Sequence, residues 1–438
     1  MKNKKYFTFM LWKILKKVLP IFLKKLVIQL LNLSRQRLYA FLLKYECKLC
    51  MKLLGFKKCE IVFLDTLKEE KVLRNKVKSS IFTPLINDNR KCEYVDAPTV
   101  KLYLLSDVFI SAKSSNFNKD NKAIIERIPS IELEYCNYST GVVASHDLNL
   151  AVVKDNKKNI KNIDDGIFLG GNGSWNYYHW MTEILPKIQF IQEINILNFT
   201  KNILVSISVK KTESFLKTIK NALKDLKVNL IFLEPSEIYK VKNLYVISSP
   251  NSILIKSNKT ITSPKYIFLR NESLQYVRNL VFEMVKNYNQ KKLLNISNEL
   301  KNKNGKLNIF LSRKKGSARE YNQDEICKML VQECDIKQIY IEDYSIEEQA
   351  FIFLNADLII GAQGAAWTNL LFCKKGSLAI SWIPKHLKDF SAYSTLAEYY
   401  GVAMHFIEAN PRNIKKLHSG YNVPLNELRK KIRHLNFK

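Results

Sequence analysis

The sequence predicts an α/β protein with two domains that face a cleft, preceded by a basic amphipathic helical arm. Three observations lead to this fold class. The chain has 438 residues, which is long for a single hydrophobic core and makes two domains the default expectation. Short apolar runs alternate with helical patterns over most of the length, as in proteins with a mainly parallel sheet. A polar stretch rich in Asn and Lys, residues 295–306, interrupts this alternation once, and we place the domain junction there.

Residues 1–57 are the expected arm, in which lysines interleave with Leu, Ile and Phe at roughly helical spacing. Pro20 is expected to break it into two pieces. Its longest uncharged run, residues 26–34, is much shorter than the roughly 20 residues that a membrane span requires. No small-residue cleavage site follows, as a signal peptide would need. The arm either lies on an anionic membrane surface, which we favour, or is a helical extension packed on the protein body.

The first domain is expected over residues 58–290 and the second over residues 300–415. A basic helix is expected within residues 416–438, and it could cross back to the first domain. Apolar runs predict the strands of the first domain at residues 61–64, 100–105, 131–135, 167–169, 203–207, 228–233 and 244–247. The same pattern predicts those of the second at residues 307–311, 338–341, 358–360, 378–382 and 404–407.

Composition narrows the partners. Hydrophobic residues make up 47% of the chain and aromatic residues 11%, which excludes a disordered or fibrous protein. The formal net charge is +30, carried mainly by lysine, and part of this excess is a solvated lysine-rich surface. A positive field favours anionic partners such as nucleotide sugars, phospholipid head groups or polyanionic glycans. We expect no nucleic-acid partner, because the lysines are dispersed and no nucleic-acid motif occurs.

The cysteines do not form a metal or disulfide pattern. There are eight, and only Cys47 and Cys50 form a Cys-x-x-Cys pair, with no second pair to complete a zinc site. The absence of a disulfide framework is typical of a reducing compartment. The sequence therefore predicts a cytoplasmic protein.

The segment 357–369 is the most informative part of the chain. It has the pattern of a buried strand, a turn bracketed by Gly361 and Gly364, and a helix that starts near Ala365. Such a turn leaves unpaired backbone N–H groups at the start of a helix, where the helix dipole adds partial positive charge. Small residues let a phosphate approach the backbone closely, which predicts a site for a nucleotide diphosphate. Many turns of this kind serve tight packing alone, so the turn by itself leaves both interpretations open.

His179 and Glu183 are candidates for acid–base chemistry. They are four residues apart, so on a helix they share one face. A carboxylate that holds one imidazole nitrogen fixes the tautomer and makes the other nitrogen a better base. The pair also follows a glycine-rich strand end, where clefts open in α/β folds. The alternative is a salt pair on a helix surface, packed beside neighbouring aromatic residues.

Two arginines and two polar helix starts are candidates for ligand binding. Arg313 directly follows a predicted strand, where a guanidinium can grip a diphosphate in two-pronged fashion, with Arg319 assisting. Asn322 lies where a helix N-cap is expected, so it either caps the helix, worth about 1 kcal/mol, or contacts the ligand. Glu347 and Glu348 lie in the first turn of another helix, where their charges complement the helix dipole.

Four local signatures lie in an order that matches one family. They are Asn176–Glu183, then Leu311–Lys314 with Arg319 and Asn322–Glu325 downstream, then Tyr344–Gln349, and finally the Gly361–Asn369 turn. Over about residues 95–410 the chain resembles the family 61 glycosyltransferases, including bacterial members from capsular and surface-polysaccharide loci. The resemblance implies a GT-B architecture of two Rossmann-like domains, a nucleotide-sugar donor and inversion at the anomeric carbon.

The resemblance also implies roles for individual residues. His179 would be the base and Glu183 its orienter, with the acceptor against residues 95–260 and the donor against residues 307–410. The implied donor-binding residues are Arg313, Arg319, Asn322, Glu347, Gly361, Gln363, Gly364, Ala365, Thr368 and Asn369.

Gln363 departs from the family pattern, which often has histidine before the second glycine. Its amide can still donate a hydrogen bond to phosphate or ribose, but it cannot protonate a leaving group. Thr368 and Asn369 could contact phosphate or cap the helix locally.

The sequence therefore predicts an inverting glycosyltransferase on the cytoplasmic membrane face, with UDP the favoured nucleotide and a glycan or lipid-linked acceptor. No metal or cofactor is expected, since no two aspartates are separated by one residue as in an Asp-x-Asp clamp. The lack of a Gly-x-x-x-x-Gly-Lys-Ser/Thr motif excludes P-loop kinases. The alternative function is a noncatalytic family member that acts as a binding or scaffold protein in polysaccharide assembly.

Overall fold

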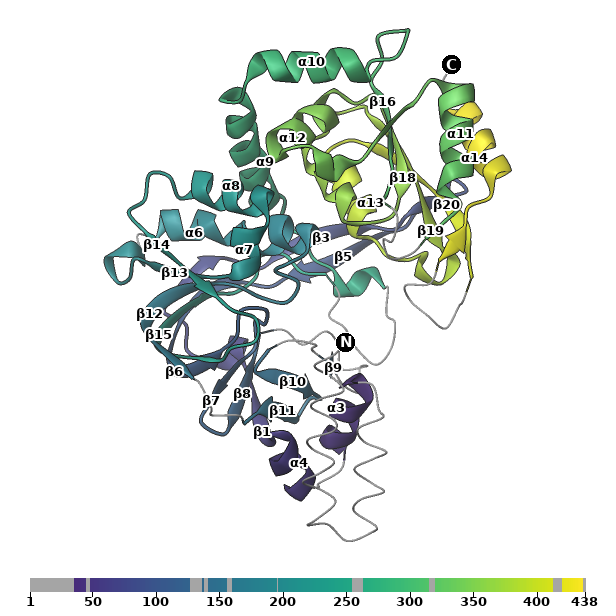
Figure 1. Cartoon of the computed structure of the whole chain (residues 1–438). Coiled ribbons are helices and arrows are strands. Elements are labelled where there is room, and N and C mark those ends of the chain that lie inside the picture. The colour runs from purple at the N-terminus through teal and green to yellow at the C-terminus, as the bar shows by residue number, and fades with distance from the viewer. Residues whose placement is uncertain are drawn as a thin grey trace, which may run out of the picture.

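The computed structural model describes residues 35–44, 48–126, 136–137, 141–155, 160–194, 196–253, 263–314, 320–412 and 420–435. They form a mixed α/β protein with a large sheet of 12 strands, a second sheet of seven strands and a two-stranded ribbon (Figure 1). Within these ranges no helix combines the length and apolar character needed to cross a membrane.

The first sheet has the strand order β14-β13-β12-β15-β6-β7-β8-β1-β11-β10-β9, with β2 paired to β6. Its strands are β1 (Phe56–Phe63), β2 (Lys71–Arg74), β6 (Val100–Ile110), β7 (Phe117–Lys119), β8 (Lys122–Ile125), β9 (Cys136–Asn137), β10 (Val143–His146), β11 (Leu150–Lys154), β12 (Lys161–Leu169), β13 (Asn202–Ser206), β14 (Asn229–Leu233) and β15 (Tyr239–Ile247).

Only part of this first sheet is parallel. Strands β12 to β15 pair in parallel, as the alternation of strands and helices predicts. The pairs β6–β15, β7–β8 and β10–β11 are antiparallel, so the expectation of a mainly parallel sheet is wrong for this half. For the β7–β8 pair the physical reason is local, because Asp120 adopts a left-handed backbone (φ 50°) and closes a tight hairpin without a helix. The strand expected at residues 131–135 lies outside the described residues.

The second sheet is parallel apart from its last strand, in the order β17-β16-β18-β19-β20-β21, with β4 paired to β20. Its strands are β4 (Leu85–Ile86), β16 (Asn308–Leu311), β17 (Lys337–Ile339), β18 (Leu358–Ala362), β19 (Leu378–Pro384), β20 (Ala403–Pro411) and β21 (Tyr421–Asn422). Strands β16 and β18 are buried throughout, as expected for parallel strands that are covered on both faces.

Helices cover both sheets, and the ribbon joins them (Figure 1). The helices are α3 (Arg35–Lys44), α4 (Lys48–Leu54), α5 (Tyr177–His179), α6 (Lys187–Glu193), α7 (Ile207–Lys211), α8 (Glu213–Ala222), α9 (Asn271–Lys286), α10 (Gln290–Leu300), α11 (Gln323–Cys334), α12 (Ile346–Asn355), α13 (Ala392–Tyr399) and α14 (Leu425–His434). The shorter helical segments are η1 (Leu64–Thr66), η2 (Trp180–Ile184), η3 (Ile196–Asn198), η4 (Pro264–Tyr266), η5 (Ile341–Asp343), η6 (Ala365–Phe372) and η7 (Lys385–Leu387). The ribbon consists of β3 (Val77–Phe82) and β5 (Cys92–Ala97).

The two sheets share one core. A single cluster of buried apolar side chains includes Ile167 and Ile203 of the first sheet and Ile309 and Ile359 of the second. Arg278 on α9 reinforces this contact by donating hydrogen bonds to the carbonyl groups of η6 and the residue after it. The two sheets are therefore packed against a common core.

The chain crosses between the sheets earlier than the sequence indicates. Residues 85–86, which fall within the expected first domain, form β4 and pair with β20 of the second sheet. The ribbon that carries them is fixed to α13, where the Phe82 N–H donates to Thr395 Oγ1 at 3.0 Å. A pairing between strands more than 300 residues apart leaves no local signal in the sequence.

Helix α14 does not cross back to the first sheet. Its buried residues Leu428 and Ile432 belong to the same apolar cluster as Ile326 of α11 and Ile360 of β18. Arg429 also forms an ion pair with Glu333 at 2.7 Å, which ties α14 to α11. The apolar face of α14 thus covers the second sheet, and the crossing considered from the sequence is corrected.

The end of the N-terminal arm packs on the first sheet. In α3, Leu42 and Leu43 are buried in a cluster with Ala144 of β10 and Val152 of β11. For this part the packed alternative is confirmed, because its apolar face is covered by protein. Residues 1–34 lie outside the described residues, so membrane binding by them stays a prediction.

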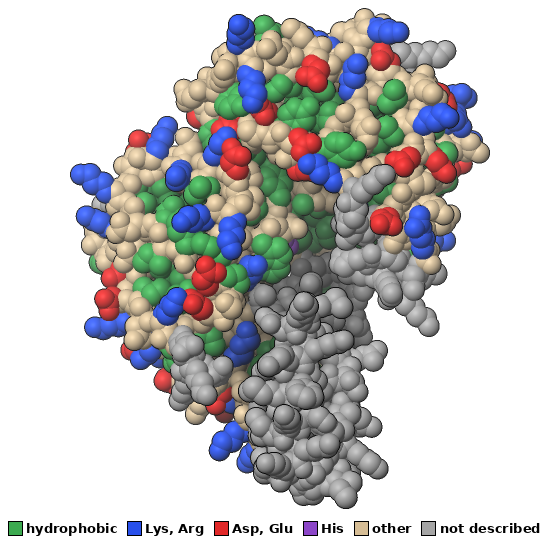
Figure 2. All heavy atoms as spheres, in the orientation of Figure 1, with side chains coloured by type: hydrophobic (Ala, Val, Ile, Leu, Met, Phe, Trp, Pro, Cys, Tyr) green, Lys and Arg blue, Asp and Glu red, His purple; other side chains and the backbone are tan. Residues whose placement is uncertain are grey.

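Charged side chains are spread over the surface. On the face shown in Figure 2, Lys and Arg side chains lie among Asp and Glu over both sheets and do not gather in one patch. Local ion pairs account for part of this mixing, for example Lys76 with Asp96 at 2.6 Å and Lys240 with Asp107 at 3.0 Å.

Glu348 makes the stability of the fold depend on pH. It closes a capping box at the start of α12, where its carboxylate accepts from the Ser345 N–H at 2.8 Å. It also accepts from Tyr288 at 2.9 Å and pairs with Lys292 at 2.6 Å. Burial raises the pKa of Glu348, but these donors outweigh burial and hold its pKa below the ordinary value of 4.5.

The stability that Glu348 contributes is therefore present above about pH 4.5 and is lost as the pH falls below it. We expect Glu348→Gln to lower the free energy of unfolding by about 1–2 kcal/mol at neutral pH. The variant should lose less stability than the native protein on acidification. Urea denaturation at neutral and acidic pH checks this, with Glu299→Gln, an exposed carboxylate on α10, as control. An unchanged pH dependence in Glu348→Gln would contradict the assignment.

Candidate active site

A cavity of about 410 Å³ lies between the two sheets. Its volume is within the range of roughly 300–1,000 Å³ that is usual for small-molecule sites. The first sheet contributes residues from the start of α5 and α8, and the second contributes residues from η5, α12 and η6. The lining residues are Trp175, Tyr177, Thr212, Glu213, Ser214, Phe215, Ile341, Glu342, Tyr344, Ser345, Ile346, Gln349, Ala366 and Asn369. Three of the four sequence signatures thus meet in this cavity.

A chain of hydrogen bonds joins these three signatures. The Tyr177 hydroxyl donates to Asn369 Oδ1 at 2.6 Å, and Asn369 Nδ2 donates to Gln349 Oε1 at 3.0 Å. Gln349 Nε2 in turn donates to the Tyr344 carbonyl at 2.8 Å. Burial raises the pKa of Tyr177 far above its ordinary value, so its hydroxyl keeps its proton and acts as a donor. The orientation of the Asn369 amide is therefore fixed from both sides.

Trp175, Tyr177 and Gln349 have no role predicted from the sequence, although all three line the cavity. Two of them lie inside the quoted signatures and the third directly precedes one. Their hydroxyl, amide and indole groups were the available signal. What the sequence could not show is that they face Asn369, because the Tyr177–Asn369 pair spans 192 residues.

The glycine turn follows β18 as expected, and its parts serve different purposes. Gly361 is buried in the sheet, where a Cβ atom would lie 2.8 Å from Leu311 Cβ, so this glycine permits close strand packing. Gly364, Ala365 and Ala366 are partly exposed, and Ala366 lines the cavity. The helix that follows, η6, is a 3-10 helix rather than the α-helix expected. Its first backbone N–H groups lie beside the cavity.

Arg313 reaches this turn. Its guanidinium donates to the Gln363 carbonyl, and a Cβ atom on Gly364 would lie only 2.9 Å from its Nη2. Gln323 holds the Arg313 backbone in both directions, at 2.7 and 2.9 Å. The structure thus brings Arg313 together with Gln363 and Gly364, as predicted. Arg319 lies outside the described residues.

Two predicted donor-binding side chains retain unused hydrogen-bonding groups. Gln363 is 3% exposed and Thr368 is fully buried. Among the described residues, Gln363 Nε2 and Thr368 Oγ1 have no hydrogen-bond partner. Buried polar groups in proteins are nearly always satisfied. The turn therefore carries donor capacity that a bound oxygen-rich ligand could use.

Asn322 and Glu347 lie outside the lining of the cavity. The Asn322 side chain does not cap α11, so this expectation is wrong; it instead exchanges hydrogen bonds with the backbone of Val423, at 2.9 and 3.1 Å. It fastens α11 to the C-terminal segment. The Glu347 carboxylate lies 3.6 Å from Lys217 Nζ of α8, so it forms an ion pair between the two layers.

His179 and Glu183 come together as predicted, although their helix is irregular. The expected continuous helix is divided into α5, a π-helical turn η2 and α6. His179 Nδ1 lies 3.1 Å from Glu183 Oε2, which is an ion-pair distance, although the contact does not have the geometry of a hydrogen bond. The Glu183 side chain is 3% exposed, and its Oε1 accepts from the Ile253 N–H at 2.9 Å. π-helical turns such as η2, when inserted in an α-helix, often mark functional sites.

The imidazole is also held from the other side. Gly173 has φ +80°, and a Cβ atom there would lie 2.3 Å from His179 Cδ2. The ring therefore packs directly on the glycine backbone, with Nδ1 towards Glu183. The His179 side chain is 22% exposed, which leaves it accessible to a reactant. Neither His179 nor Arg313 is among the described residues that line this interlobe cavity between the two sheets. His179 is two residues from Tyr177 of the lining, and Arg313 contacts the glycine turn.

In the described part of the chain, no group of three or more His, Cys, Asp or Glu side chains is arranged to hold a metal ion.

The protein is thus a mixed α/β protein with a cavity between its two sheets. Residues 177–380 match the model of the family described as Glycosyltransferase 61. On this match the protein is a glycosyltransferase, and the resemblance to family 61 is supported over that stretch. The match begins at Tyr177, contains Arg313, α12 and the glycine turn, and ends within β19. A comparison with curated proteins found no match.

Proposed function

We propose that the protein is an inverting, metal-independent glycosyltransferase with a GT-B-like arrangement. It transfers a sugar from a nucleotide donor, with UDP favoured, to a glycan or lipid-linked acceptor in surface or capsular polysaccharide synthesis. The observation that carries the proposal is the interlobe cavity, in which Tyr177, Asn369 and Gln349 form one hydrogen-bonded chain. We also propose that the enzyme acts at the cytoplasmic membrane face, where the basic segment of residues 1–34 lies on anionic lipid.

The chemistry of the cavity favours a particular orientation of the donor. Its walls include the aromatic rings of Trp175, Phe215 and Tyr344, while Glu213 and Glu342 place carboxylates on it. Carboxylates repel phosphate but accept hydrogen bonds from hydroxyl groups, so the cavity suits the nucleoside or the sugar. The diphosphate then belongs at the start of η6, near the Arg313 guanidinium and the unused Gln363 amide.

The glutamine at position 363, where the family often has histidine, does not favour the noncatalytic alternative. A side chain that only filled space would have no reason to keep a buried, unsatisfied amide next to the turn. The amide can donate to a phosphate oxygen without taking part in proton transfer.

In the proposed reaction, His179 Nε2 removes the proton of an acceptor hydroxyl. The hydroxyl oxygen attacks the anomeric carbon from the face opposite the diphosphate and forms the new C–O bond. The bond between the anomeric carbon and the diphosphate oxygen breaks, and the nucleoside diphosphate leaves with the electron pair. Glu183 stabilises the imidazolium, which then releases its proton to solvent.

A thermal-shift panel of UDP-, GDP- and CMP-sugars tests the proposal. A donor at 100 times its dissociation constant should stabilise the protein by about 2.7 kcal/mol. Asn369→Ala should abolish the shift, because the variant loses the residue that joins the two walls of the cavity. Asn279→Ala, at an exposed site on α9, is the matched control and should keep it. A panel without any shift, or a shift that persists in Asn369→Ala, would count against the donor site.

A further inference from the structure

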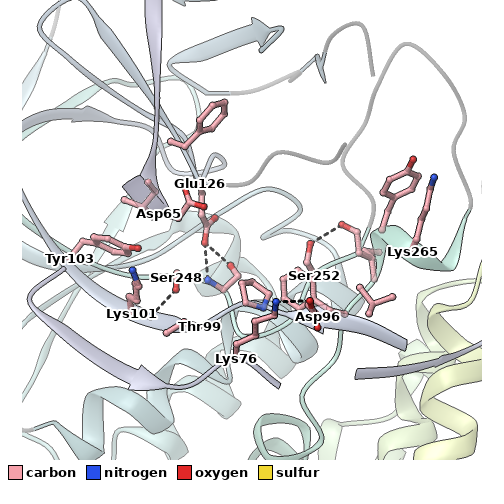
Figure 3. Close-up of a pocket in the computed structure, with 18 residues that line it drawn as sticks. Asp65, Lys76, Asp96, Thr99, Lys101, Tyr103, Glu126, Ser248, Ser252 and Lys265 are labelled. Atoms are coloured by element: carbon pink, nitrogen blue, oxygen red, sulfur yellow. Dashed lines mark hydrogen bonds and ion pairs between the residues drawn. The ribbon is translucent and has the colours of Figure 1, made fainter. Parts of the chain in front are cut away.

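A second cavity, of about 590 Å³, lies on the first sheet at the ends of β1, β8 and β15 (Figure 3). It shares no lining residue with the interlobe cavity. Its lining combines carboxylates, ammonium groups, serine hydroxyls and aromatic rings. Among these residues are Asp65, Asp96, Tyr103, Glu126, Tyr266 and Phe268.

One wall of this cavity is bonded to the helix that carries His179. The wall is the segment of residues 248–253, which follows β15. The Ile253 N–H donates to Glu183 Oε1 at 2.9 Å, and Asn251 Nδ2 donates to the Thr182 carbonyl at 2.6 Å. Ile253 itself lines the cavity, so a ligand there contacts a residue that directly holds the carboxylate partner of His179.

A buried ion pair continues this connection. The Glu126 and Lys187 side chains are each 2% exposed, and Lys187 Nζ lies 3.6 Å from Glu126 Oε1. Glu126 also accepts from the Ser249 N–H at 2.9 Å and from the Ser249 hydroxyl at 2.8 Å. Lys187 lies on α6, one turn beyond Glu183. The cavity wall and the helical segment with the proposed base are therefore joined by hydrogen bonds and by a buried ion pair.

His179 lies between the two cavities along the chain. Tyr177, two residues before it, lines the interlobe cavity, and Glu183, four residues after it, is bonded to the wall of the second one. The second cavity is therefore joined to the Glu183 side of His179, and an acceptor glycan held there would extend beyond the cavity to bring its reacting hydroxyl group to Nε2.

We propose that the second cavity is an acceptor subsite that holds an uncharged sugar unit of the acceptor glycan. The proposal rests on the proposed function and names the substrate class for its acceptor side. The donor and acceptor groups of the lining can bind hydroxyl groups, while the rings of Tyr266 and Phe268 can cover an apolar sugar face.

The charges of the cavity do not favour a phosphorylated or otherwise anionic unit, because its three lysines are matched by three carboxylates. Lys76 and Asp96 neutralise each other at 2.6 Å, and Glu126 is paired with Lys187. Tyr103 is surrounded by carboxylates; burial, with Asp65, Glu69 and Glu126 adding to it, raises the pKa of Tyr103 to about 12. No arginine is present among the described lining residues. An anion would therefore meet negative potential around Tyr103, whereas a neutral hydroxyl can donate to these carboxylates.

Saturation-transfer-difference NMR on the full chain tests the subsite. The probes are methyl β-glucopyranoside, methyl β-galactopyranoside and methyl N-acetyl-β-glucosaminide, with glucose 6-phosphate as the anionic comparison. We expect at least one methyl glycoside to bind better than glucose 6-phosphate. Asp65→Asn and Tyr266→Ala should each weaken that binding by about tenfold, or ~1.4 kcal/mol. Matched controls outside the cavity are Asp107→Asn and Tyr94→Ala, which are exposed and should bind as the native protein does.

The donor thermal shift separates this proposal from the proposed function. Both cavity variants should keep the nucleotide-sugar shift, which also shows that they are folded. If the native protein binds no methyl glycoside, binds glucose 6-phosphate best, or binds the glycosides unchanged in both variants, the subsite is overturned while the donor site stands. If no nucleotide sugar binds at all, the proposed function fails, and a retained glycoside signal would then describe a sugar-binding site without transfer.

Discussion

His179→Ala should lower kcat for sugar transfer by a factor of about 10²–10⁴, the usual contribution of a positioned general base. The expectation rests on geometry. Nδ1 lies 3.1 Å from the buried carboxylate of Glu183, and Gly173 supports the ring from the other side, which directs Nε2 away from Glu183. Without the imidazole, the acceptor hydroxyl must lose its proton to water. Steady-state transfer kinetics with a donor found in the nucleotide-sugar panel measure the effect.

Donor binding should survive this change, because His179 is not among the described residues that line the interlobe cavity. The thermal shift with nucleotide sugar should therefore be the same in His179→Ala and in the native protein. Glu183→Gln should show a smaller loss of kcat, since it keeps the shape but removes the charge that stabilises the imidazolium. His434→Ala, at an exposed position on α14, is the control and should leave kcat unchanged. Native turnover by a folded His179→Ala protein would remove His179 from the mechanism.

Arg313→Ala should lower kcat/KM for the donor by a factor of about 10²–10³, the usual loss when one preorganised group of an anion site is removed. Arg313 holds the Gln363 carbonyl and contacts Gly364 closely, so the substitution removes a positive charge and also loosens the turn. Arg313 thus plays two parts: it supports the turn in the structure, and we propose that it also binds phosphate. Donor-dependent kinetics, combined with thermal unfolding, measure both.

The conservative variant distinguishes these two parts. Arg313→Lys keeps the charge but not the planar guanidinium, so it should restore only a fraction of kcat/KM. Arg433→Ala, which removes an exposed arginine of α14, is the matched control. If Arg313→Ala and Arg433→Ala have equal, small effects on kcat/KM, then Arg313 serves the fold and does not act on the donor.

The second sheet was predictable because its signal is local. Strands such as β16 and β18 are covered on both faces, so each is a continuous apolar run in the sequence. Ser345 and Glu348 form the capping box that marks the start of α12 in the sequence. The expected strands of this sheet match the observed ones closely, apart from β4 and β21.

The first sheet was harder because its strand pairing is decided by contacts between distant segments. Strands β6 and β15 pair although they lie more than 100 residues apart, and neither apolar run indicates its partner or direction. The hairpin at Asp120 needs a left-handed residue that is not glycine, which weakens its signal. The π-helical turn η2 is likewise invisible to helical periodicity, because it still places Glu183 beside His179.

The candidate site was predicted in parts. The His179–Glu183 contact and the place of Asn369 on the cavity follow from spacing and motif. The contact of Arg313 with the turn also agrees with the prediction. Tyr177 and Gln349 could not be assigned, because their role arises only when two layers of the protein meet at Asn369. Asn322 was misjudged since its nearest backbone partner is Val423, about 100 residues away, and not its own helix.

The most direct test of this account is a crystal structure of the protein with UDP, or with whichever nucleoside diphosphate the panel identifies. We predict that the nucleoside, or in a complex with the nucleotide sugar the sugar itself, lies in the cavity lined by Tyr177, Gln349 and Asn369. The phosphates should lie within hydrogen-bond distance of the backbone N–H groups of Ala365 and Ala366 and of the Gln363 amide. A nucleotide bound in the cavity of Asp65 and Tyr103, or anywhere else away from the interlobe cavity, would contradict it.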